Sequence, residues 1–393
     1  MSAPRDGVIG AGIVGLAMAY ALARRGRRVT VFDTTRTPEG ASVRNFGTLW
    51  PIGQPAGPRR RLALESLAIW RDVLDAAGCW WAPCGSLHLA YHDDELQLIS
   101  EFAAAASTEQ FACRVIAPAE AIRCQPRIQS DGLLGALASP HEMQVNSRQA
   151  LSRIPEWLTH RWGVTFETGA RVTACGGGVI RAGGRSWPVE HAWLAPGDDV
   201  WTLYPEAFAA SGVKRCKLQM MRTAPVSWLL GPILAAGLTL THYESFAACP
   251  SFRSLRARVE RDWPDHIAHG VHVLVAQHDE RHLILGDSHQ YDDEISPFDR
   301  PDIDDLVLRY LATFLETGPL RIVERWHGTY LKHPREPYRV WDPEAGVTAV
   351  TALGGHGMTM SFGLAEQVVR QRLDTGDAGT VTETTWREPS SLA

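Results

Sequence analysis

Apolar positions follow two simple patterns along most of this chain, and each pattern predicts a type of element. Residues that alternate between apolar and polar, or that form short apolar runs, predict strands. These strands are expected over residues 85–91, 164–173, 187–195, 271–277, 282–285 and 346–353. Apolar residues that recur at helical spacing predict helices over residues 56–77, 147–162, 301–316 and 361–373. The polar segment from residue 376 onward is expected to be mobile.

The N-terminal segment carries the most specific pattern. Val8 and Ile9 precede Gly10-Ala11-Gly12-Ile13-Val14-Gly15, and a second strand ends at Asp33. The first glycine allows a sharp turn, the second lets the backbone approach a pyrophosphate, and the third lets a helix pack on the strand. Asp33 can accept hydrogen bonds from a ribose diol. The segment predicts a site for an adenine dinucleotide, and its first strand is expected to be short.

A membrane-spanning helix is the alternative interpretation of this N-terminal segment, because Gly7 to Ala23 is almost uncharged. The run has 17 residues, which is shorter than the roughly 20 that a spanning helix needs. No small-residue cleavage site follows a basic start. We therefore expect neither a membrane span nor a signal peptide here.

Composition limits the remaining classes. The chain has 393 residues, which favours two domains, and its 45% hydrophobic and 21% charged residues are typical of a globular protein. A net charge of −5 without a basic block argues against a nucleic-acid partner. Seven cysteines without a Cys-x-x-Cys pair predict free thiols and a cytoplasmic location. The 15 histidines show no metal-ligand spacing, so no metal site is predicted.

A second glycine loop, Gly354 to Thr359, lies between the last predicted strand and the last predicted helix. A helix N-terminus there offers unpaired N–H groups and a partial positive charge. Such a site suits the negative N1–C2=O edge of a reduced flavin, whereas a nicotinamide has no use for it. A simple helix cap with a tight turn is the structural alternative. Together with the first glycine loop, this one favours FAD over NAD and a discontinuous nucleotide domain.

Short motifs spread over nearly the whole chain extend this interpretation. They are Gly10 to Gly15 with Asp33, Gly40-Ala41-Ser42, Ala195-Pro196-Gly197, Trp326-His327-Gly328 and Gly354 to Ser361. With these motifs the chain resembles the D-amino-acid oxidase, glycine oxidase and sarcosine oxidase family of FAD-dependent oxidoreductases. The segments 40–47, 50–54 and 84–91 are similar to a branch of flavoproteins associated with aminophosphonate breakdown.

The resemblance implies a fold of mixed α/β and α+β class, similar to that of glycine oxidase. A Rossmann-type FAD-binding domain would carry an inserted substrate domain built on an antiparallel sheet. The FAD-binding domain is expected to comprise residues 1–79, 144–215 and 325–393. The substrate domain is expected to comprise residues 80–143 and 216–324, with the flavin ring at the boundary.

The resemblance also implies the chemistry. Hydride would pass from the α-carbon of an amine to flavin N5, water would hydrolyse the resulting imine, and dioxygen would reoxidise the flavin. No general base is obligatory, so no catalytic side chain is predicted. The expected substrate is a small anionic primary or secondary amine, with 2-aminoethylphosphonate or its N-methyl form as the first choice. The alternatives are a glycine, sarcosine or D-amino-acid oxidase, an FAD-binding subunit of a larger dehydrogenase, and a nicotinamide dehydrogenase.

The cofactor-binding residues that the resemblance implies lie in six separate segments. They are Gly10, Gly12, Ile13, Val14, Gly15, Asp33, Ser42, Arg44, Asn45, Val172, Gly197, Gly355, Gly357, Met358 and Thr359. Ser42 could instead be a turn hydroxyl, and Arg44 a surface ion-pair partner. The chain has no cysteine after Cys249, so FAD is expected to bind without a covalent link, although His333 could in principle form one.

The substrate site departs from the family pattern. Amino-acid oxidases of this family carry an arginine two residues after the glycine of the Trp-x-Gly turn, but Gly328 is followed by Thr329 and Tyr330. This puts a simple α-amino acid in doubt, and a phosphonate could suit several dispersed cations better. The candidates for substrate binding are Arg44, His242, Tyr330, Lys332, His333 and His356. Each histidine could instead be a structural or surface residue.

Overall fold

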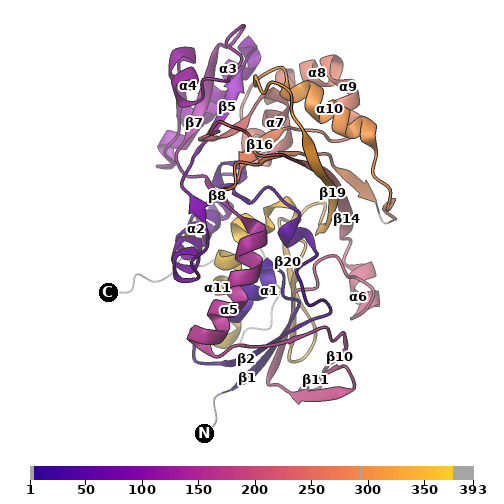
Figure 1. The fold of residues 1–393 in the computed structure, drawn as a ribbon. Coiled ribbons are helices and arrows are strands. Elements are labelled where there is room, and N and C mark those ends of the chain that lie inside the picture. Colours follow the sequence, from indigo (N-terminus) through magenta and orange to yellow (C-terminus); the bar gives the residue numbers. More distant parts are fainter. Residues whose placement is uncertain (1–3, 293, 375–393) are drawn as a thin grey trace.

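The computed structural model describes residues 4–292 and 294–374, which build two large sheets in the two halves of the molecule (Figure 1). The lower half holds a six-stranded sheet in the order β20-β21-β13-β1-β2-β9. Its strands are β1 (Arg5–Ile9), β2 (Arg28–Asp33), β9 (Thr165–Thr168), β13 (His191–Leu194), β20 (Arg339–Glu344) and β21 (Val347–Thr351). All pairs are parallel except β20 with β21. The strand order reverses beside β1, which opens a crevice at the carboxyl ends of β1 and β13.

Helices cover one face of this sheet, and short strands cover the other. The helices are α1 (Ile13–Ala23), α2 (Pro58–Ala76), α5 (Ser147–Trp162) and α11 (Gly357–Asp374). α1 is apolar on all sides because it is enclosed by the sheet, α5 and α11. The opposite face carries β10 (Val172–Gly176), β11 (Val179–Ala182), β12 (Arg185–Pro188) and the short helix α6 (Pro205–Ala210).

The upper half is built on a nine-stranded sheet in the order β18-β14-β17-β16-β15-β5-β7-β6, with β19 also paired to β14. Its strands are β5 (Ser86–Ala90), β6 (Arg114–Ile116), β7 (Gly135–Ser139), β14 (Lys214–Thr223), β15 (Ile233–Ala235), β16 (Leu274–Gln277), β17 (Leu283–Gly286), β18 (Gln290–Asp292) and β19 (Ile322–Lys332). All pairs are antiparallel except β5 with β15. A small sheet of β3 (Thr48–Leu49), β4 (Trp81–Ala82) and β8 (Met143–Val145) lies where the chain passes between the halves.

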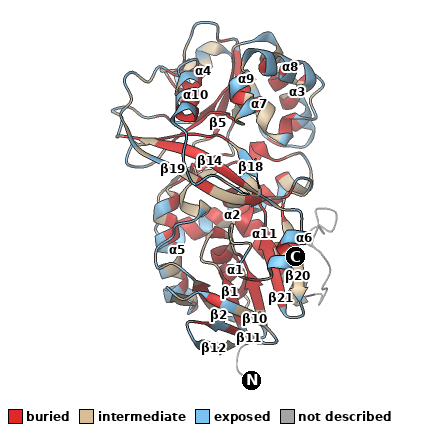
Figure 2. Ribbon diagram, turned by 90° about the vertical axis from the view of Figure 1, so that its right-hand side faces the viewer, coloured by how far each residue is buried: buried red, intermediate tan, exposed pale blue. Residues whose placement is uncertain are grey.

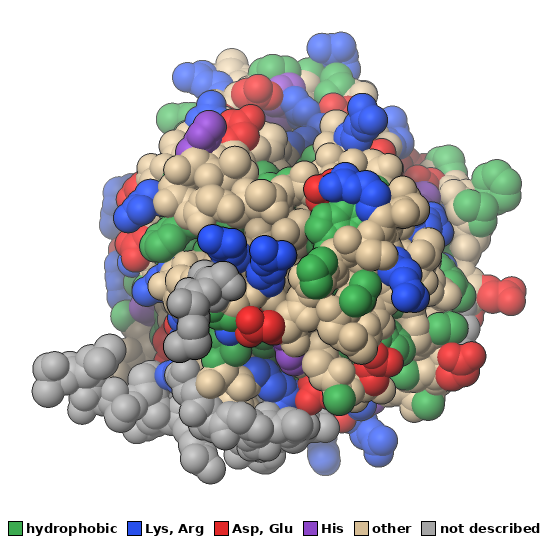
Figure 3. Space-filling view, turned by 90° about the horizontal axis from the view of Figure 1, so that it is seen from below, with side chains coloured by type: hydrophobic (Ala, Val, Ile, Leu, Met, Phe, Trp, Pro, Cys, Tyr) green, Lys and Arg blue, Asp and Glu red, His purple; other side chains and the backbone are tan. Residues whose placement is uncertain are grey.

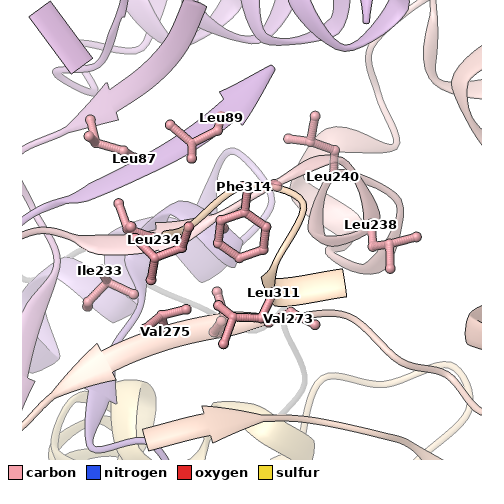
Figure 4. Close-up of a cluster of buried hydrophobic side chains, with 14 of the residues drawn as sticks. Leu87, Leu89, Ile233, Leu234, Leu238, Leu240, Val273, Val275, Leu311 and Phe314 are labelled. Carbon is pink, nitrogen blue, oxygen red and sulfur yellow. The ribbon is translucent and has the colours of Figure 1, made fainter. Parts of the chain in front are cut away.

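Helices pack over the nine-stranded sheet and enclose its core. They are α3 (Asp93–Thr108), α4 (Pro118–Cys124), α7 (Gly237–His242), α8 (Phe252–Asp262), α9 (Pro264–Ala268) and α10 (Pro301–Leu311). The core side chains labelled in Figure 4 come from β5, β15, β16, α7 and α10, together with Val273 and Phe314, and they are almost fully buried. Each such side chain contributes about 1.5–3 kcal/mol by leaving water. Figure 2 shows buried residues concentrated along both sheets, with exposed residues on the outer helix faces.

The predicted fold class is confirmed, with a mainly parallel sheet in one half and a mainly antiparallel sheet in the other. The expectation of a short first strand is wrong, because β1 starts at Arg5. Asp6 lies inside it, 1% exposed, with Trp193 Nε1 donating to it at 3.0 Å and Arg27 forming an ion pair. A charged residue that is paired in this way can occupy a buried strand, and the hydrophobic pattern does not reveal it.

Two helix boundaries differ from expectation, and the domain boundary at residue 325 remains a prediction. The last helix begins at Gly357 rather than at residue 361, so the second glycine loop supplies its first turn. The helix expected over residues 301–316 ends at Leu311. The expected domain boundary at residue 325 falls inside β19, which pairs with β14 along nearly its whole length. The polar segment from residue 376 onward lies outside the described residues.

The surface and the cysteines are ordinary for a globular enzyme. Figure 3 shows Lys, Arg, Asp and Glu side chains interspersed over the face seen from below. All seven cysteines are free thiols, as predicted. In the part of the chain that the structure describes, no helix combines the length and the apolar character needed to cross a membrane.

Candidate active site

The first glycine loop joins β1 to α1 at the point where the strand order of the six-stranded sheet reverses. Gly10 has a φ of +106°, and a Cβ there would lie 2.1 Å from the carbonyl oxygen of Ala195. A Cβ on Gly15 would lie 1.8 Å from the carbonyl oxygen of Gly10. Neither position has room for a side chain, so the turn and the helix packing both require glycine.

Asp33 and Ser42 hold this loop in place. Asp33 Oδ2 accepts the N–H of Ala11 at 2.7 Å, and Asp33 Oδ1 accepts the N–H of Thr35 at 2.8 Å. Ser42 Oγ accepts the N–H of Ile13, in the first turn of α1, at 2.9 Å. The hydroxyl proton of Ser42 is therefore left to be donated to a phosphate oxygen beside the helix N-terminus.

A cavity lies between the two sheets and is lined by both glycine loops and by β14, β16 and β19. The predicted cofactor-binding residues that line it are Gly12, Ile13, Val14, Ser42, Arg44, Asn45, Gly197, Gly355, Gly357, Met358 and Thr359. The predicted substrate-binding residues that line it are Arg44, His242, Tyr330, Lys332 and His356. Residues that are more than 300 positions apart in the sequence thus meet in one cavity.

Five of the predicted site residues lie outside the cavity lining, namely Gly10, Gly15, Asp33, Val172 and His333. Val172 is buried in a hydrophobic cluster on the far face of the six-stranded sheet. His333 is 6% exposed, and its Nδ1 accepts the N–H groups of Arg335 and Glu336 at 3.3 and 3.0 Å. His333 therefore closes the turn after β19. This is the structural role that the sequence analysis named as the alternative to substrate binding.

The second glycine loop leads from β21 into α11. Ala352 and Gly354 both have positive φ, +56° and +57°, so the chain turns sharply just before the helix. Thr359 Oγ1 accepts the N–H of Trp50 at 2.9 Å and ties the first turn of α11 to the other half of the cavity wall. The first N–H groups of α11, from Gly357 onward, lack partners within the helix. This helix end is suited to a negatively charged edge of a ligand.

Arg44 and Asn45 belong to the segment that follows Ser42. Asn45 Nδ2 donates to the Ala41 carbonyl at 2.8 Å, and Asn45 Oδ1 accepts the Gly47 N–H at 2.7 Å, so this amide positions its own loop. Arg44 Nη1 donates to the carbonyl oxygen of His327 at 3.1 Å. In the described part of the chain no carboxylate pairs with Arg44, and its guanidinium keeps further donors for a ligand in the cavity.

Tyr330 and Lys332 lie two residues apart on β19 and both face the cavity. A Cβ on Gly355 would lie 3.6 Å from the Tyr330 hydroxyl, so this phenol lies beside the second glycine loop. Burial raises the pKa of Tyr330 well above its usual value, which keeps the phenol neutral. Lys332 Nζ lies 3.4 Å from the Tyr291 hydroxyl and 5.2 Å from the centre of that ring. Lys332 has no carboxylate partner within the described residues.

His356 lies in the second glycine loop, and its ring is held from one side. Its Nδ1 lies 2.8 Å from Nε2 of Gln54, which is fully buried. Burial, and then the nearby ammonium of Lys332, lower the pKa of His356 to about 4. The imidazole is therefore neutral at neutral pH, and it can take part in hydrogen bonds without carrying a charge.

The structure also brings to the cavity four residues that the sequence did not single out: Asp287, His272, His289 and Tyr291. They come from the predicted hairpin and the strand after it, and they surround His242 at the end of α7. Ligand atoms of His242, His272 and His289 lie within 4.8 Å of one another. No sequence spacing signals this cluster, because its members come from three separate segments. The Asp287-Ser288-His289 run directly after a strand was the only available hint.

The cavity fits FAD. Two helix N-termini line it, and the outer glycines of the first loop are sterically required. At Gly357, where the backbone is helical, a Cβ would meet no protein atom within 4 Å, so the space is free for a ligand. These features define a flavin-dependent oxidoreductase with a Rossmann-type nucleotide-binding half.

The family of FAD dependent oxidoreductases designated DAO matches residues 7–371, and the chain belongs to this family. The predicted cofactor and enzyme class are thereby confirmed. Gly12 to Val14, Ser42 and the N-terminus of α1 would hold the pyrophosphate side of FAD, and Gly355 to Thr359 would hold the flavin. This assignment of individual residues remains a prediction.

Solved structures of the same fold include amino-acid oxidoreductases. The L-proline dehydrogenase from P. horikoshii is similar over 95% of this chain and 94% of that chain, with a TM-score of 0.78 and 17% identity. Glycine oxidase from Bacillus cereus is similar over 95% and 96%, with a TM-score of 0.77 and 15% identity. These likenesses confirm the glycine oxidase-like fold.

One curated relative matches only part of the chain. The tRNA 5-methylaminomethyl-2-thiouridine biosynthesis bifunctional protein MnmC of Chromohalobacter salexigens is 38% identical over 92 residues. Those residues are 22% of this chain and 13% of that protein. The match therefore carries no conclusion about the activity of the whole chain.

Proposed function

We propose that this protein is an FAD-dependent oxidase of a small anionic primary or secondary amine, with 2-aminoethylphosphonate or its N-methyl form as the substrate. The observation that supports this proposal is the charge of the cavity wall. Two cations, Arg44 and Lys332, line the cavity against a single carboxylate, Asp287, among the described residues, and four histidines add imidazole groups that can form hydrogen bonds. Such a wall favours an anion.

Tyr330 supports a phosphonate over a simple carboxylate. It stands where the amino-acid oxidases of this family carry an arginine, and no other arginine than Arg44 lines the described part of the cavity. A planar carboxylate is best bound by a guanidinium that donates two parallel hydrogen bonds. A phosphonate has three acceptor oxygens in a tetrahedral arrangement, and it can accept hydrogen bonds from several separate donors. The dispersed donors of this cavity match that geometry.

The chain's own residues would bind and orient the substrate. When bound, FAD supplies the oxidant that accepts a hydride from the carbon next to the amine nitrogen. The cationic wall would fix the anionic end of the substrate, and so direct that carbon toward the second glycine loop. Met220, Leu218 and Leu274 supply an apolar surface beside the cationic groups. This surface favours the neutral amine, which is the form that can give up a hydride.

The second candidate function is oxidation of glycine, sarcosine or a D-amino acid. Arg44 supports it, because its guanidinium lines the cavity and could pair with a carboxylate. A third possibility is an FAD-binding subunit that needs a partner to act. The seven free thiols are compatible with the reducing cytoplasm, which we propose as the location.

Anaerobic flavin bleaching tests these candidates. The purified holoprotein is mixed under argon with 2-aminoethylphosphonate, its N-methyl form, glycine, sarcosine and D-alanine, and the flavin absorbance is followed. We expect the aminophosphonates to bleach the flavin at the lowest concentrations. Bleaching by sarcosine or D-alanine with no response to either aminophosphonate would refute the proposal, and no bleaching at all would favour the subunit. Peroxide formation in air then tests whether dioxygen is the acceptor.

A further inference from the structure

Three histidines that the sequence keeps apart form one stack in the cavity wall. His242 ends α7, His272 precedes β16, and His289 follows β17. The ring centres of His242 and His272 are 3.7 Å apart, those of His242 and His289 are 4.5 Å apart, and those of His272 and His289 are 5.3 Å apart. All three side chains line the cavity. Three imidazoles thus present their polar atoms to one small volume.

One carboxylate lies behind this stack. His272 Nε2 lies 3.0 Å from Asp287 Oδ1, and His289 Nε2 lies 3.8 Å from Asp287 Oδ2. Burial alone would raise the pKa of Asp287, but His289 and His272 outweigh burial and lower it. Asp287 is therefore ionised at neutral pH, and it supports a positive charge on the rings next to it.

The polar atoms of the stack are incompletely satisfied. His289 Nδ1 lies 3.0 Å from the carbonyl oxygen of Gly270, which fixes that ring. His272 is 3% exposed, and its Nδ1 has no hydrogen-bond partner among the residues that the structure describes. A buried polar atom without a partner costs about 1–3 kcal/mol. A ligand that supplies an acceptor to His272 would remove this cost.

The groups around the stack are mostly basic or neutral. Those that face it are Lys332, His356, His88, Tyr243, Tyr291 and Asp287, with Glu244 and Arg59 at the outer side. Burial lowers the pKa of His242, and His272, His289 and Lys332 lower it further. Burial likewise lowers the pKa of His289 despite the opposing effect of Asp287. The imidazoles of His242 and His289 are therefore neutral in the free site, and a bound anion would help to protonate them.

On the basis of the proposed function, we propose that His242, His272 and His289 form the subsite for the oxyanion of the substrate, with Asp287 beside them. Binding of the anion in this subsite is coupled to the uptake of one proton by the protein. The stack offers N–H donors from several directions, as a tetrahedral oxyanion requires. Lys332 and one protonated imidazole, against one carboxylate, would offset part of the charge of a dianion, and the other imidazoles would donate hydrogen bonds to it. A protonated imidazole would then bridge Asp287 and the phosphonate.

A metal ion fits this cluster less well than an anion does. Two nitrogens bound to one zinc ion at about 2.1 Å cannot lie more than about 4.2 Å apart. The ligand atoms of the three histidines lie within 4.8 Å of one another, and the rings of His242 and His272 are stacked face to face at 3.7 Å, so these two rings do not converge on one point. Donors spaced in this way can bind different oxygens of one anion more readily than they can converge on a single metal ion.

Isothermal titration calorimetry of the holoprotein with ethylphosphonate tests the proposal. This probe has the anion but no amine, so it cannot reduce the flavin. The titration is run above the second pKa of the probe, in buffers of different ionisation enthalpy, so that the slope counts protons taken up by the protein. We expect uptake of about one proton for the wild type. For His289→Gln we expect about 10-fold weaker binding and less than half of that uptake.

Matched variants separate this subsite from general effects. His191→Gln changes a histidine of β13 outside the cavity and should bind ethylphosphonate as the wild type does. His242→Gln changes another partly exposed member of the stack and repeats the test if His289→Gln does not retain FAD. Binding without proton uptake, unchanged binding in both stack variants, or a stoichiometric metal in the purified protein would overturn the subsite. If the subsite were refuted in this way but an aminophosphonate still bleached the flavin, the proposed function would hold without the subsite. If no phosphonate bound to the protein or bleached its flavin, the subsite and the proposed function would both be refuted.

Discussion

Gly357 offers a direct test of how the second glycine loop binds FAD. This residue is the first of α11, with φ −54° and ψ −46°, which any residue can adopt. A Cβ there would meet no protein atom within 4 Å, yet the residue lines the cavity. Alanine is favoured over glycine in helices by up to about 1 kcal/mol. Gly357→Ala should therefore leave the apoprotein as stable as the wild type or slightly more stable.

FAD affinity should change in the opposite direction. If the flavin edge approaches the N–H groups of Gly357 and Met358, an added methyl group would push it away. Loss of one hydrogen bond to a charged acceptor costs about 1.5–3 kcal/mol, so the Kd for FAD should rise about 10- to 100-fold. Fluorescence titration of apoprotein with FAD measures this Kd, and urea unfolding of the apoprotein measures its stability.

Gly40→Ala is the matched control for this experiment. Gly40 also has ordinary backbone angles, with φ −76° and ψ −166°, and space for a Cβ, but it is exposed and lies outside the cavity lining. Its substitution should leave FAD affinity within about twofold of the wild type. If Gly357→Ala bound FAD as tightly as Gly40→Ala does, the flavin would not lie against this helix end.

Three further substitutions address the substrate site and the fold. Lys332→Met should raise KM for an anionic amine about 10- to 100-fold with little change in kcat, and an unchanged KM in steady-state assays would exclude Lys332 from the anion site. Asp6→Ala should lower the free energy of unfolding by about 3 kcal/mol, because it leaves the charge of Arg27 without its buried partner; a urea midpoint equal to that of the wild type would contradict this. Burial raises the pKa of Glu142, so this carboxyl stabilises the folded protein while it is protonated. That contribution is fully present below the pKa of Glu142 in the unfolded chain, and it is lost as the pH rises through the pKa of Glu142 in the folded protein. Glu142→Gln should remove this pH-dependent loss of stability. Parallel curves of unfolding free energy against pH for the wild type and the variant would refute the role of Glu142.

The sequence alone determined the FAD-binding half of this protein. Glycine spacing at Gly10 to Gly15, and the strand, glycine loop and helix around Gly354, are local patterns whose backbone requirements can be stated without a structure. The same holds for the strands and helices, because their apolar spacing reports which faces are buried. The buried Asp6 escaped this reasoning, since only its contacts with Trp193 and Arg27 make its burial possible.

Only the tertiary structure decided the character of the proposed substrate site. His242, His272 and His289 come from three segments, and no spacing along the chain indicates that their rings stack. The structure also placed His333 in a turn, although its position beside Lys332 made it an equal candidate by sequence. Local patterns specify the backbone of a loop or helix, whereas a site made of side chains from distant strands exists only once the sheet pairing brings those strands together.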